Sequence, residues 1–302
     1  MLALLILPML LAACGGGQQA PGPAALAADN AGLMTPESST CRTPPPLTAD
    51  SFADPTRIDN PYLPFPPGQQ FILEGTAVDH GRALPHRIET TATNLTKVID
   101  GIRTLVVFEQ DFKSGVLQAS EIFFQAQDRN GAVWNFGEYP EEYDNGVLHG
   151  APSTWIVGVD GGLAGYAMLG RPQTGTQTYV QGIGPEVGFH DCATVIQSGR
   201  RICSNGRCYD NVVVIDEYAP TEPGNGHQHK LLAPGVSTFN VANGSGNDIE
   251  ALDLTSAKRL CGVALQKIVD ETAVQDHRAY GVAPTVWQGT APVEATLPLP
   301  AC

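Results

Sequence analysis

Short runs of β-branched and aromatic residues, separated by turn dipeptides, constrain the fold of this 302-residue chain more than any other feature. The plainest example places Asp100-Gly101 between the runs 95–99 and 102–108. An Asp-Gly or Asn-Gly pair between such runs is a strong hairpin signal, and Asn205-Gly206 repeats it. Turns this frequent predict an antiparallel sheet over about residues 69 to 241, because parallel strands need long crossover connections.

The pattern changes to a helical period near the C-terminus. Apolar residues fall at steps of three and four and predict one long helix over about residues 256 to 280, capped by Thr255 or Ser256. Residues 283–302, rich in Pro and Thr, are expected to form an extended strap. The predicted fold class is therefore α+β, a large curved antiparallel β-sheet with one long C-terminal amphipathic helix packed on it. The apolar stripe of the helix consists of Ala257, Leu260, Cys261, Ala264, Leu265, Ile268 and Val269.

The N-terminus carries a second clear pattern. Residues 2–13 are almost wholly apolar, too few to span a bilayer as a helix but typical of a signal-peptide core. The run closes on Leu11-Ala12-Ala13-Cys14 and then becomes Gly-rich, which resembles the lipobox of bacterial lipoproteins. The resemblance implies that residues 1–13 are removed as a signal peptide. It also implies that Cys14 becomes the lipid-bearing N-terminus, with palmitate as a lipid modification.

The same resemblance bears on where the chain resides. Gly15 after the cysteine is compatible with export onward to an outer membrane or the cell surface. No Lys or Arg precedes the apolar run, which leaves open a true start upstream of Met1. Residues 14–40, rich in Gly, Gln, Ala, Pro and Ser, are predicted to be a flexible tether, and residues 41–302 to form a single β-rich domain.

Six cysteines remain when Cys14 is set aside, and an even number in an exported chain favours three disulfides. Cys203 and Cys208 flank Asn205-Gly206, so their sulfurs are expected to face each other across a hairpin. A Cys41–Cys302 bond would tie the ends of the domain together, and a Cys261–Cys192 bond would tie the helix to the sheet. The sequence leaves open the pairing of Cys41, Cys192, Cys261 and Cys302.

The net charge of −14, with 31 acidic residues against 17 basic ones, is spread along the chain. Such a surface repels phosphate backbones, which argues against nucleic acid as a partner. Contact with a membrane is therefore expected through the lipid on Cys14. The other partner classes that fit are an envelope protein and a small ligand.

Three blocks within residues 57–240 resemble a group of secreted bacterial proteins whose function is not established. Residues 59–68 are similar to their N-P-Y-x-P-x-x-P-G lead-in, which precedes a large β-sheet. Residues 128–138 match their D-x-x-G-x-V-W-x-F-G-E hairpin, and residues 230–236 are similar to their K-Y-Y-A-P-G-V strand. The resemblance implies a shared fold and an exported location, but no activity.

The sequence lacks the common enzyme motifs G-x-S-x-G, H-E-x-x-H and the P-loop. The best candidate metal ligands are His227 and His229, because the period of a strand would point both imidazoles to one face. The alternative is an exposed loop with two solvated histidines. Further ligands would have to come from Asp216, Glu217, Glu222, His149 or His190.

A second candidate site surrounds the expected hairpin at Asn145-Gly146. Carboxylates beside tyrosine rings suit sugar rings or a hard cation such as Ca²⁺, and a carboxylate pair would suit acid–base work on a glycoside. The alternative is a solvated loop. Trp134 and Phe136 on the preceding strand share a face that is expected to be core. The candidate residues are Glu138, Tyr139, Glu141, Glu142, Tyr143 and Asp144.

These observations favour an envelope lipoprotein with a non-catalytic domain that binds a ligand or another protein. No cofactor is assigned, apart from a candidate divalent metal. The alternative is a metal-binding protein or metal-dependent hydrolase that uses His227 and His229.

Overall fold

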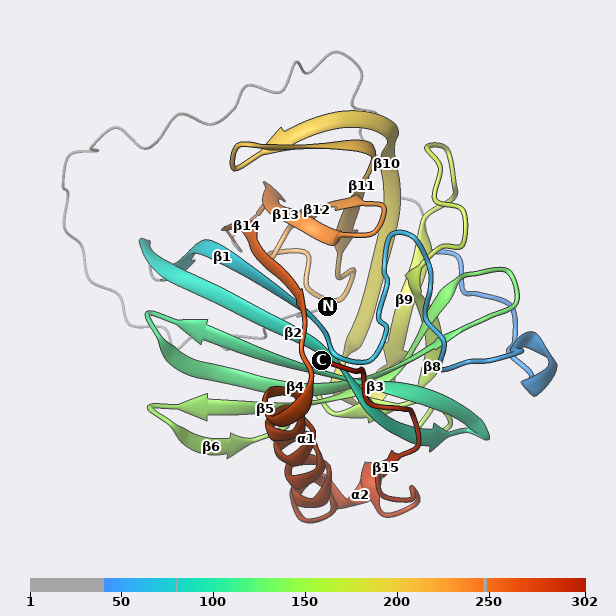
Figure 1. Ribbon diagram of the computed structural model, residues 1–302. Helices are drawn as coiled ribbons and strands as arrows, with labels where there is room; N and C mark the ends of the chain where they lie inside the picture. Colours follow the sequence, from blue (N-terminus) through green and yellow to red (C-terminus); the bar gives the residue numbers. More distant parts are fainter. Residues whose placement is uncertain (1–40, 80, 247–248) are drawn as a thin grey trace. The chain divides into compact units, whose positions relative to one another are not determined.

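The computed structural model describes residues 41–79, 81–246 and 249–302. The predictions of a signal peptide, of lipid on Cys14 and of a tether over residues 14–40 lie outside the described residues. Strands dominate the domain, and the long helix α1 (Gly262–Val282) follows them near the C-terminus (Figure 1). The prediction of a mainly antiparallel β domain with a C-terminal helix is confirmed.

The elements follow one another through short connections. A short helix, α2 (Pro284–Trp287), comes directly after α1, and single 3-10 turns lie at Ala49–Ser51 and Pro185–Val187. The strands are β1 (Gln69–Asp79), β2 (Arg82–Ile99), β3 (Ile102–Lys113), β4 (Val116–Gln127), β5 (Val133–Asp144), β6 (Val147–Gly150), β7 (Trp155–Ile156), β8 (Leu163–Met168), β9 (Tyr179–Gly184), β10 (Phe189–Ser204), β11 (Arg207–Tyr218), β12 (His227–Ala233), β13 (Ser237–Ser245), β14 (Glu250–Arg259) and β15 (Glu294–Ala295).

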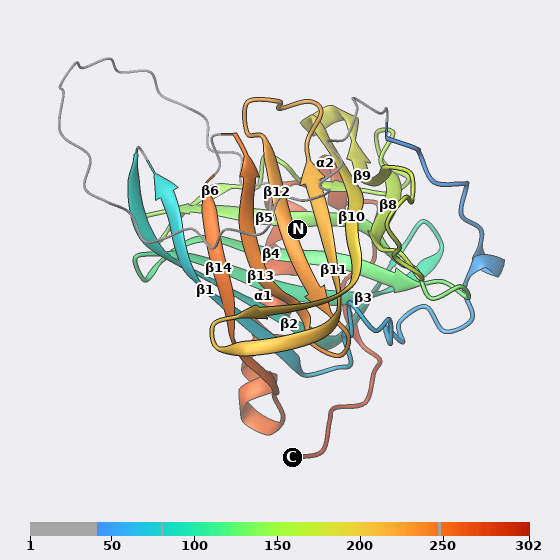
Figure 2. The same ribbon diagram turned by 90° about the horizontal axis from the view of Figure 1, so that it is seen from above.

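The sheet closes on itself, which the sequence prediction of a curved sheet did not include. Its order is β1-β14-β13-β12-β11-β10-β9-β8-β5-β4-β3-β2, and β1 also pairs with β2 to complete the ring. Each pairing that joins neighbours around this ring is antiparallel, as the turn pattern predicted. Strands β10 to β13 lie across β2 to β5 on the opposite side of the closed sheet (Figures 1 and 2).

The turn dipeptides form the tight hairpins that they predicted. Asp100 and Gly101 have φ angles of 47° and 78°, and Ile99 pairs directly with Ile102. Two consecutive positive φ angles match the twist of a two-residue hairpin, which explains why Asp-Gly occurs there. Asn205 and Gly206 form the same kind of turn between β10 and β11.

The predicted start of the helix at residue 256 is wrong. Residues 255–259 continue β14, where Ala257 pairs with Phe71 and Arg259 pairs with Gln69 on β1. The pairing closes the sheet along its whole length, and this long-range gain outweighs the local helical period. Cys261 is the N-cap residue of α1. Among the described residues, the helices lack the combination of length and apolar character that a bilayer crossing requires.

The predicted strap over residues 283–302 is also only partly extended. It begins with α2, whose Pro284 occupies the first turn, where a missing N–H has no consequence. Further on, Glu294 and Ala295 pair with Thr96 and Leu95, so β15 adds to the β2 edge beyond the closed part of the sheet.

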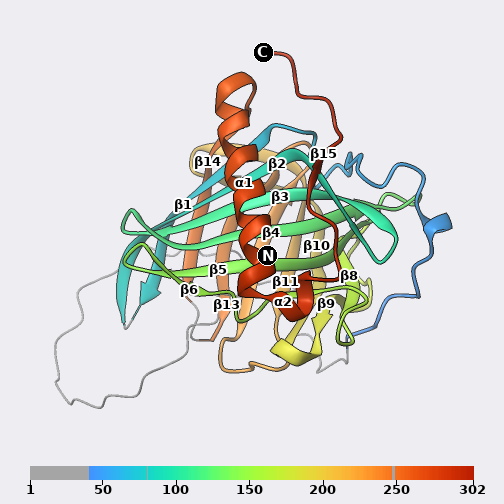
Figure 3. The same ribbon diagram turned by 90° about the horizontal axis from the view of Figure 1, so that it is seen from below.

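Helix α1 covers the outer face of β2 to β5, away from β10 to β13 (Figure 3). The apolar layer between them, here called the helix-side core, contains Trp134 and Phe136, so the prediction that these two residues are core is confirmed. Burial of apolar area in this layer stabilises the fold. Its buried members are Phe52, Leu95, Ile99, Ile102, Val106, Phe108, Ile122, Phe124, Ala126, Ala132, Trp134, Phe136, Tyr139, Ala151, Ile156, Leu265, Val269, Ala279, Ala283 and Trp287.

Three disulfides join the described cysteines. Cys203 and Cys208 lie opposite each other on β10 and β11 and are bonded, as the hairpin pattern predicted. Cys41 is bonded to Cys192, and Cys261 is bonded to Cys302. The two ties considered from the sequence, Cys41 with Cys302 and Cys261 with Cys192, are therefore wrong. The fold brings the C-terminal residue to the start of α1, a contact that no local pattern encodes.

Candidate functional site

The strands of the closed sheet turn chemically different side chains to their two faces. On β3, Val106 and Phe108 belong to the helix-side core. Glu109 and Asp111 have the opposite parity, so they point into the interior of the closed sheet. Both are buried. The interior is therefore lined by ionisable groups, whereas the outer face of the same strand is apolar.

Three glutamates from neighbouring strands form the centre of this interior. Glu109 on β3 lies directly opposite Glu121 on β4, and Glu121 hydrogen-bonds Glu138 on β5. Burial, with the charge of Glu109, raises the pKa of Glu121 to about 7. Burial also raises the pKa of Glu138 well above its usual range, with Glu121 and Asp191 adding to the effect.

Acidic groups also reach the interior from the opposite side of the sheet. Lys230 Nζ on β12 lies 2.6 Å from Glu217 Oε2 on β11, and the ammonium also interacts electrostatically with Glu109 across the interior. Gln181 Nε2 on β9 donates to Glu217 Oε1 at 2.8 Å. Burial, with the charge of Glu217, raises the pKa of Asp191 on β10 to about 7.

A histidine between two carboxylates completes the lining. His86 Nε2 on β2 lies 2.7 Å from Asp111 Oδ1, and its Nδ1 lies 2.6 Å from Glu250 Oε1 on β14. Burial opposes a charge on this imidazole, but the hydrogen bonds to Asp111 and Glu250 outweigh it and raise the pKa of His86 to about 9. Gln228 Nε2 on β12 donates to Glu250 Oε2 at 2.6 Å. His86 is therefore expected to carry a positive charge at neutral pH.

Acidic groups outnumber basic ones in this region, which we call the acidic interior. Among the described residues its two cationic groups are Lys230 and the protonated His86, against seven carboxyl groups. These residues carry a formal excess of five negative charges before any carboxyl takes up a proton. The carboxyl groups belong to Glu109, Asp111, Glu121, Glu138, Asp191, Glu217 and Glu250.

The polar atoms of the interior that have no hydrogen-bond partner within the described part of the chain include Glu121 Oε1, Gln125 Oε1 and Tyr179 Oη. Their residues are only 2%, 3% and 4% exposed. Gln125 lies four residues after Glu121 on β4 and shares its face, and Tyr179 interacts electrostatically with Glu217. An unpartnered buried polar group costs about 1–3 kcal/mol, so three in one region point to something other than stability.

The candidate metal ligands His227 and His229 lie on β12 and share a face, rather than in the exposed loop that was the alternative. Each imidazole contacts one oxygen of Asp216, with His227 Nδ1 at 2.8 Å from Oδ2 and His229 Nε2 at 3.1 Å from Oδ1. Asp216 alternates with Glu217 on β11, so this cluster faces away from the acidic interior. Metal binding by the two histidines stays a prediction.

The other proposed ligands lie elsewhere. Glu222 accepts a hydrogen bond from Asn225, and His149 Nε2 is 3.9 Å from Asp144. His190 lies near Cys41 and Cys192, and their potential metal-binding atoms are within 4.8 Å of one another. Both cysteines are oxidised in the same disulfide, so their sulfurs are not thiolates, the form in which cysteine binds metals.

The six residues proposed around Asn145-Gly146 divide between the two faces of β5. Glu138 points into the acidic interior, and Asp144 is exposed near the turn. Tyr139 packs against Trp287 in the helix-side core, with ring centroids 5.1 Å apart. Glu141 is fully buried on the same outer face and forms two hydrogen bonds with Arg278 of α1.

Tyr143 joins this outer group because its hydroxyl donates to Glu141 Oε2 at 2.6 Å. Glu142 is partly buried on β5, and burial raises its pKa. The six residues therefore do not form one platform, and of them Glu138 belongs to the acidic interior.

Most of the acidic interior escaped the sequence analysis. A signal was present, because Glu109 and Asp111 share one strand face directly after the apolar run 105–108, which is typical of a core strand. Alternation of polar and apolar side chains alone predicts a strand with one face in water. Only the closure of the sheet places that polar face inside.

No family model matches this chain. A search of curated proteins also finds no match. Among solved structures, a match exists to a Bacteroides fragilis protein described as a "putative exported protein with YmcC-like fold". The two share 9% sequence identity with a TM-score of 0.36, and the match covers 66% of this chain and 99% of that one.

Proposed function

We propose that this protein is an exported, lipid-anchored protein that binds a small ligand in the acidic interior of its closed sheet. The observation that carries the proposal is the set of buried polar atoms Glu121 Oε1, Gln125 Oε1 and Tyr179 Oη, which have no hydrogen-bond partner among the described residues. A fold selected for stability alone would place apolar side chains there, because buried polar groups without partners oppose folding. A bound ligand would supply the missing partners.

Export and anchoring are supported by the N-terminal sequence and by the disulfides. Leu11-Ala12-Ala13-Cys14 resembles a lipobox, and three disulfides fit an oxidising compartment outside the cytoplasm. The tether proposed for residues 14–40 would separate the domain from the membrane surface. We propose the outer membrane or the cell surface as its location.

The binding proposal is tested by mass spectrometry of small molecules released from the full chain after purification from an oxidising bacterial envelope. The double variant Glu121→Gln/Tyr179→Phe changes two of the side chains that carry unpartnered atoms, without adding bulk. We expect one small molecule at near-stoichiometric yield from the wild type and a large loss from the double variant. Equal recovery of the molecule from both proteins contradicts the proposal. The proposal is also contradicted if no molecule is released and no compound of a charge-diverse library stabilises the protein against heat.

The anchor is tested separately, by labelling cells with radioactive palmitate. We expect label on the wild-type chain and none on Cys14→Ser, which should leave the membrane fraction. Label that persists in Cys14→Ser contradicts the lipid assignment but leaves ligand binding untouched.

A further inference from the structure

We infer that the ligand of the acidic interior is an organic polyamine, an alkyl chain that carries several ammonium groups. The inference rests on the proposed function and names its ligand class. The first argument is charge, because seven carboxyl groups share this interior with Lys230 and His86 as the cations among the described residues. Carboxylates held this close and out of water repel one another unless protons or cations compensate them. A polycation would compensate several at once, whereas an anion would add to the repulsion.

The second argument is that an apolar row lies beside the acidic row along the interior. Glu109 lies opposite Glu121, and in the next inward-facing row Val107 lies opposite Phe123. Val107 and Phe123 are both buried. Ammonium groups would pair with the carboxylate row, while the methylene segments between them would pack on the apolar row. A polyamine likewise carries hydrocarbon segments next to its charged groups.

The third argument is that the interior already accommodates one alkylammonium group. The side chain of Lys230 is a butyl chain that ends in an ammonium, which pairs with Glu217 at 2.6 Å. It interacts electrostatically with Glu109 and Glu250 as well. The carboxyl groups of Glu121 and Glu138 have no cation at contact distance among the described ion pairs. Further ammonium groups from a ligand would repeat the chemistry of Lys230 at these positions.

The fourth argument separates a polyamine from a metal ion. A hard cation such as Ca²⁺ needs several oxygens around one point, at about 2.3–2.6 Å. Among the described residues, the set of three or more potential ligands whose atoms lie within 4.8 Å of one another is Cys41, His190 and Cys192, none of which belongs to the acidic interior. The carboxylates are instead distributed over strands on both sides of the sheet, which suits an extended ligand.

Neutral acceptors would complete the contacts. Gln125 Oε1 and the oxygen of Tyr179 Oη are unpartnered among the described residues and can each accept a hydrogen bond from an ammonium or a secondary amine. Ammonium groups donate but do not accept, so a polyamine matches a lining in which acceptors are in excess.

Isothermal titration calorimetry on the full chain in a nonionic detergent at pH 8 tests this inference. The titrants are 1-aminobutane, 1,4-diaminobutane and spermidine, which carry one, two and three amino groups, and calcium chloride is a separate arm. We expect affinity to rise with the number of amino groups and calcium to bind at least about tenfold more weakly than spermidine. Glu121→Gln, a substitution of nearly equal volume, is expected to weaken spermidine binding about tenfold.

Asp210→Asn is the matched control, because this carboxylate is exposed on the β10–β11 hairpin and pairs with Arg201. It should leave spermidine binding unchanged. Equal affinity for 1-aminobutane and spermidine, preference for calcium, equal weakening by both substitutions, or no binding overturns the polyamine assignment. If spermidine fails but a released molecule is still lost from Glu121→Gln/Tyr179→Phe, ligand binding in the interior stands and only the ligand class falls.

Discussion

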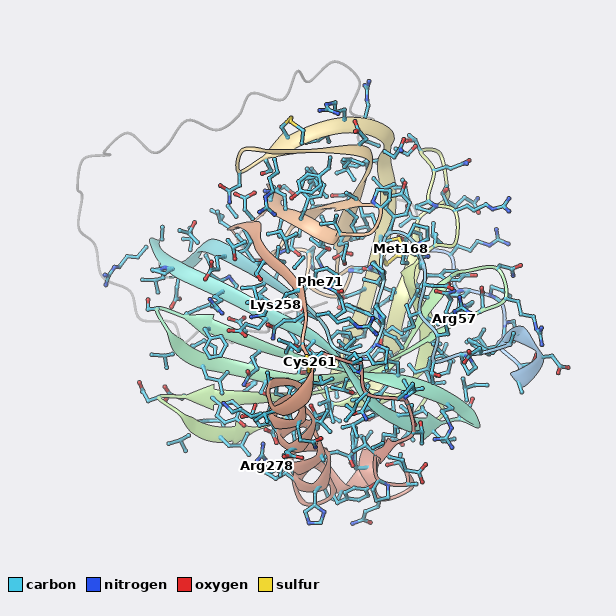
Figure 4. The ribbon with its side chains drawn as sticks, in the orientation of Figure 1. Arg57, Phe71, Met168, Lys258, Cys261 and Arg278 are labelled. Carbon is cyan, nitrogen blue, oxygen red and sulfur yellow. A yellow bond between two sulfur atoms is a disulfide. The ribbon has the colours of Figure 1, made fainter. Side chains whose placement is uncertain are left out.

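The two faces of β3 to β5 bury charged groups in opposite ways. Under α1, Lys97 Nζ contacts Asp276 Oδ1 at 2.8 Å. Glu141 forms a bidentate pair with Arg278, which lies on α1 (Figure 4). In the acidic interior, Glu121 and Glu138 hydrogen-bond each other and have raised pKa values. Partnered charges are compatible with stability, whereas clustered like charges oppose it.

The two faces of this one layer of sheet therefore use their buried polar groups differently. Asp276 Oδ1 also accepts a hydrogen bond from Trp287 Nε1, and Asp276 Oδ2 accepts one from the backbone N–H of Val293, so the polar groups beside the helix are used to fix α1 and α2. The acidic interior, in contrast, contains polar atoms without hydrogen-bond partners among the described residues. We therefore expect the face under α1 to stabilise the fold and the opposite face to bind the proposed ligand.

The largest expected effect comes from breaking the pair beneath the helix. Asp276→Ala leaves Lys97 buried without its counter-ion, with a side-chain exposure of 0%. We expect the free energy of unfolding in urea to fall by about 3–5 kcal/mol. Asp270→Ala, on the exposed side of the same helix, is the control and should change it by less than about 0.5 kcal/mol. Similar losses of unfolding free energy in both variants would contradict the claim that the buried pair stabilises the fold more than an exposed charge does.

The next largest effect is the pH dependence of the wild-type chain. The pKa of Glu121 rises from its ordinary 4.5 to about 7, so the folded state binds more protons than the unfolded state between these values. Stability is therefore fully present below pH 4.5 and falls as pH rises towards 7, by about 3 kcal/mol from this group. Asp191 acts in the same direction. Urea midpoints at pH 5 and pH 8 test this, and equal unfolding free energies would show that the interior is not strained.

His86 is expected to extend this fall to higher pH. Its pKa rises from 6.5 to about 9 beside Asp111 and Glu250, so its stabilising charge is present below pH 6.5 and is lost as pH rises through 9. His86→Gln should lower the unfolding free energy by about 1–3 kcal/mol at pH 6 and by much less at pH 10. The exposed His149→Gln serves as control. A loss that does not vary with pH would assign His86 a packing role only.

The smallest effect is expected at an exposed ion pair. Arg103 Nη1 lies 3.2 Å from Glu294 Oε2, with side chains 42% and 60% exposed. Arg103→Gln should reduce the unfolding free energy by less than about 1 kcal/mol, and added salt should reduce the difference further. A loss as large as that of Asp276→Ala would show that burial does not decide the strength of these pairs.

The sequence predicts local features of this molecule well. Asp100-Gly101 and Asn205-Gly206 fix tight hairpins through their own backbone preferences, and the second pair also brings Cys203 and Cys208 together. Trp134 and Phe136 share a buried face because strand alternation is local as well.

Features that depend on distant parts of the chain were not predicted. Residues 255–259 carry a helical period but pair with β1, which closes the sheet. Closure then places the polar face that includes Glu109 and Asp111 inside the sheet, where both residues are buried. No local pattern distinguishes these two outcomes, because a polar face alternating with an apolar one looks the same in an open and in a closed sheet.

One matched pair of substitutions tests the division between the faces most directly. Glu121 and Glu141 are both buried and lie on β4 and β5, where Glu121 pairs with Pro140 and Ser120 pairs with Glu141. We would measure the urea unfolding free energy of Glu121→Gln and Glu141→Gln at pH 8. We predict that the unfolding free energy rises in Glu121→Gln, because the substitution removes a buried charge that lies among like charges. We predict that it falls in Glu141→Gln, because Arg278 then lacks its carboxylate partner. A comparable loss in both variants would contradict the claim that the two faces serve different purposes.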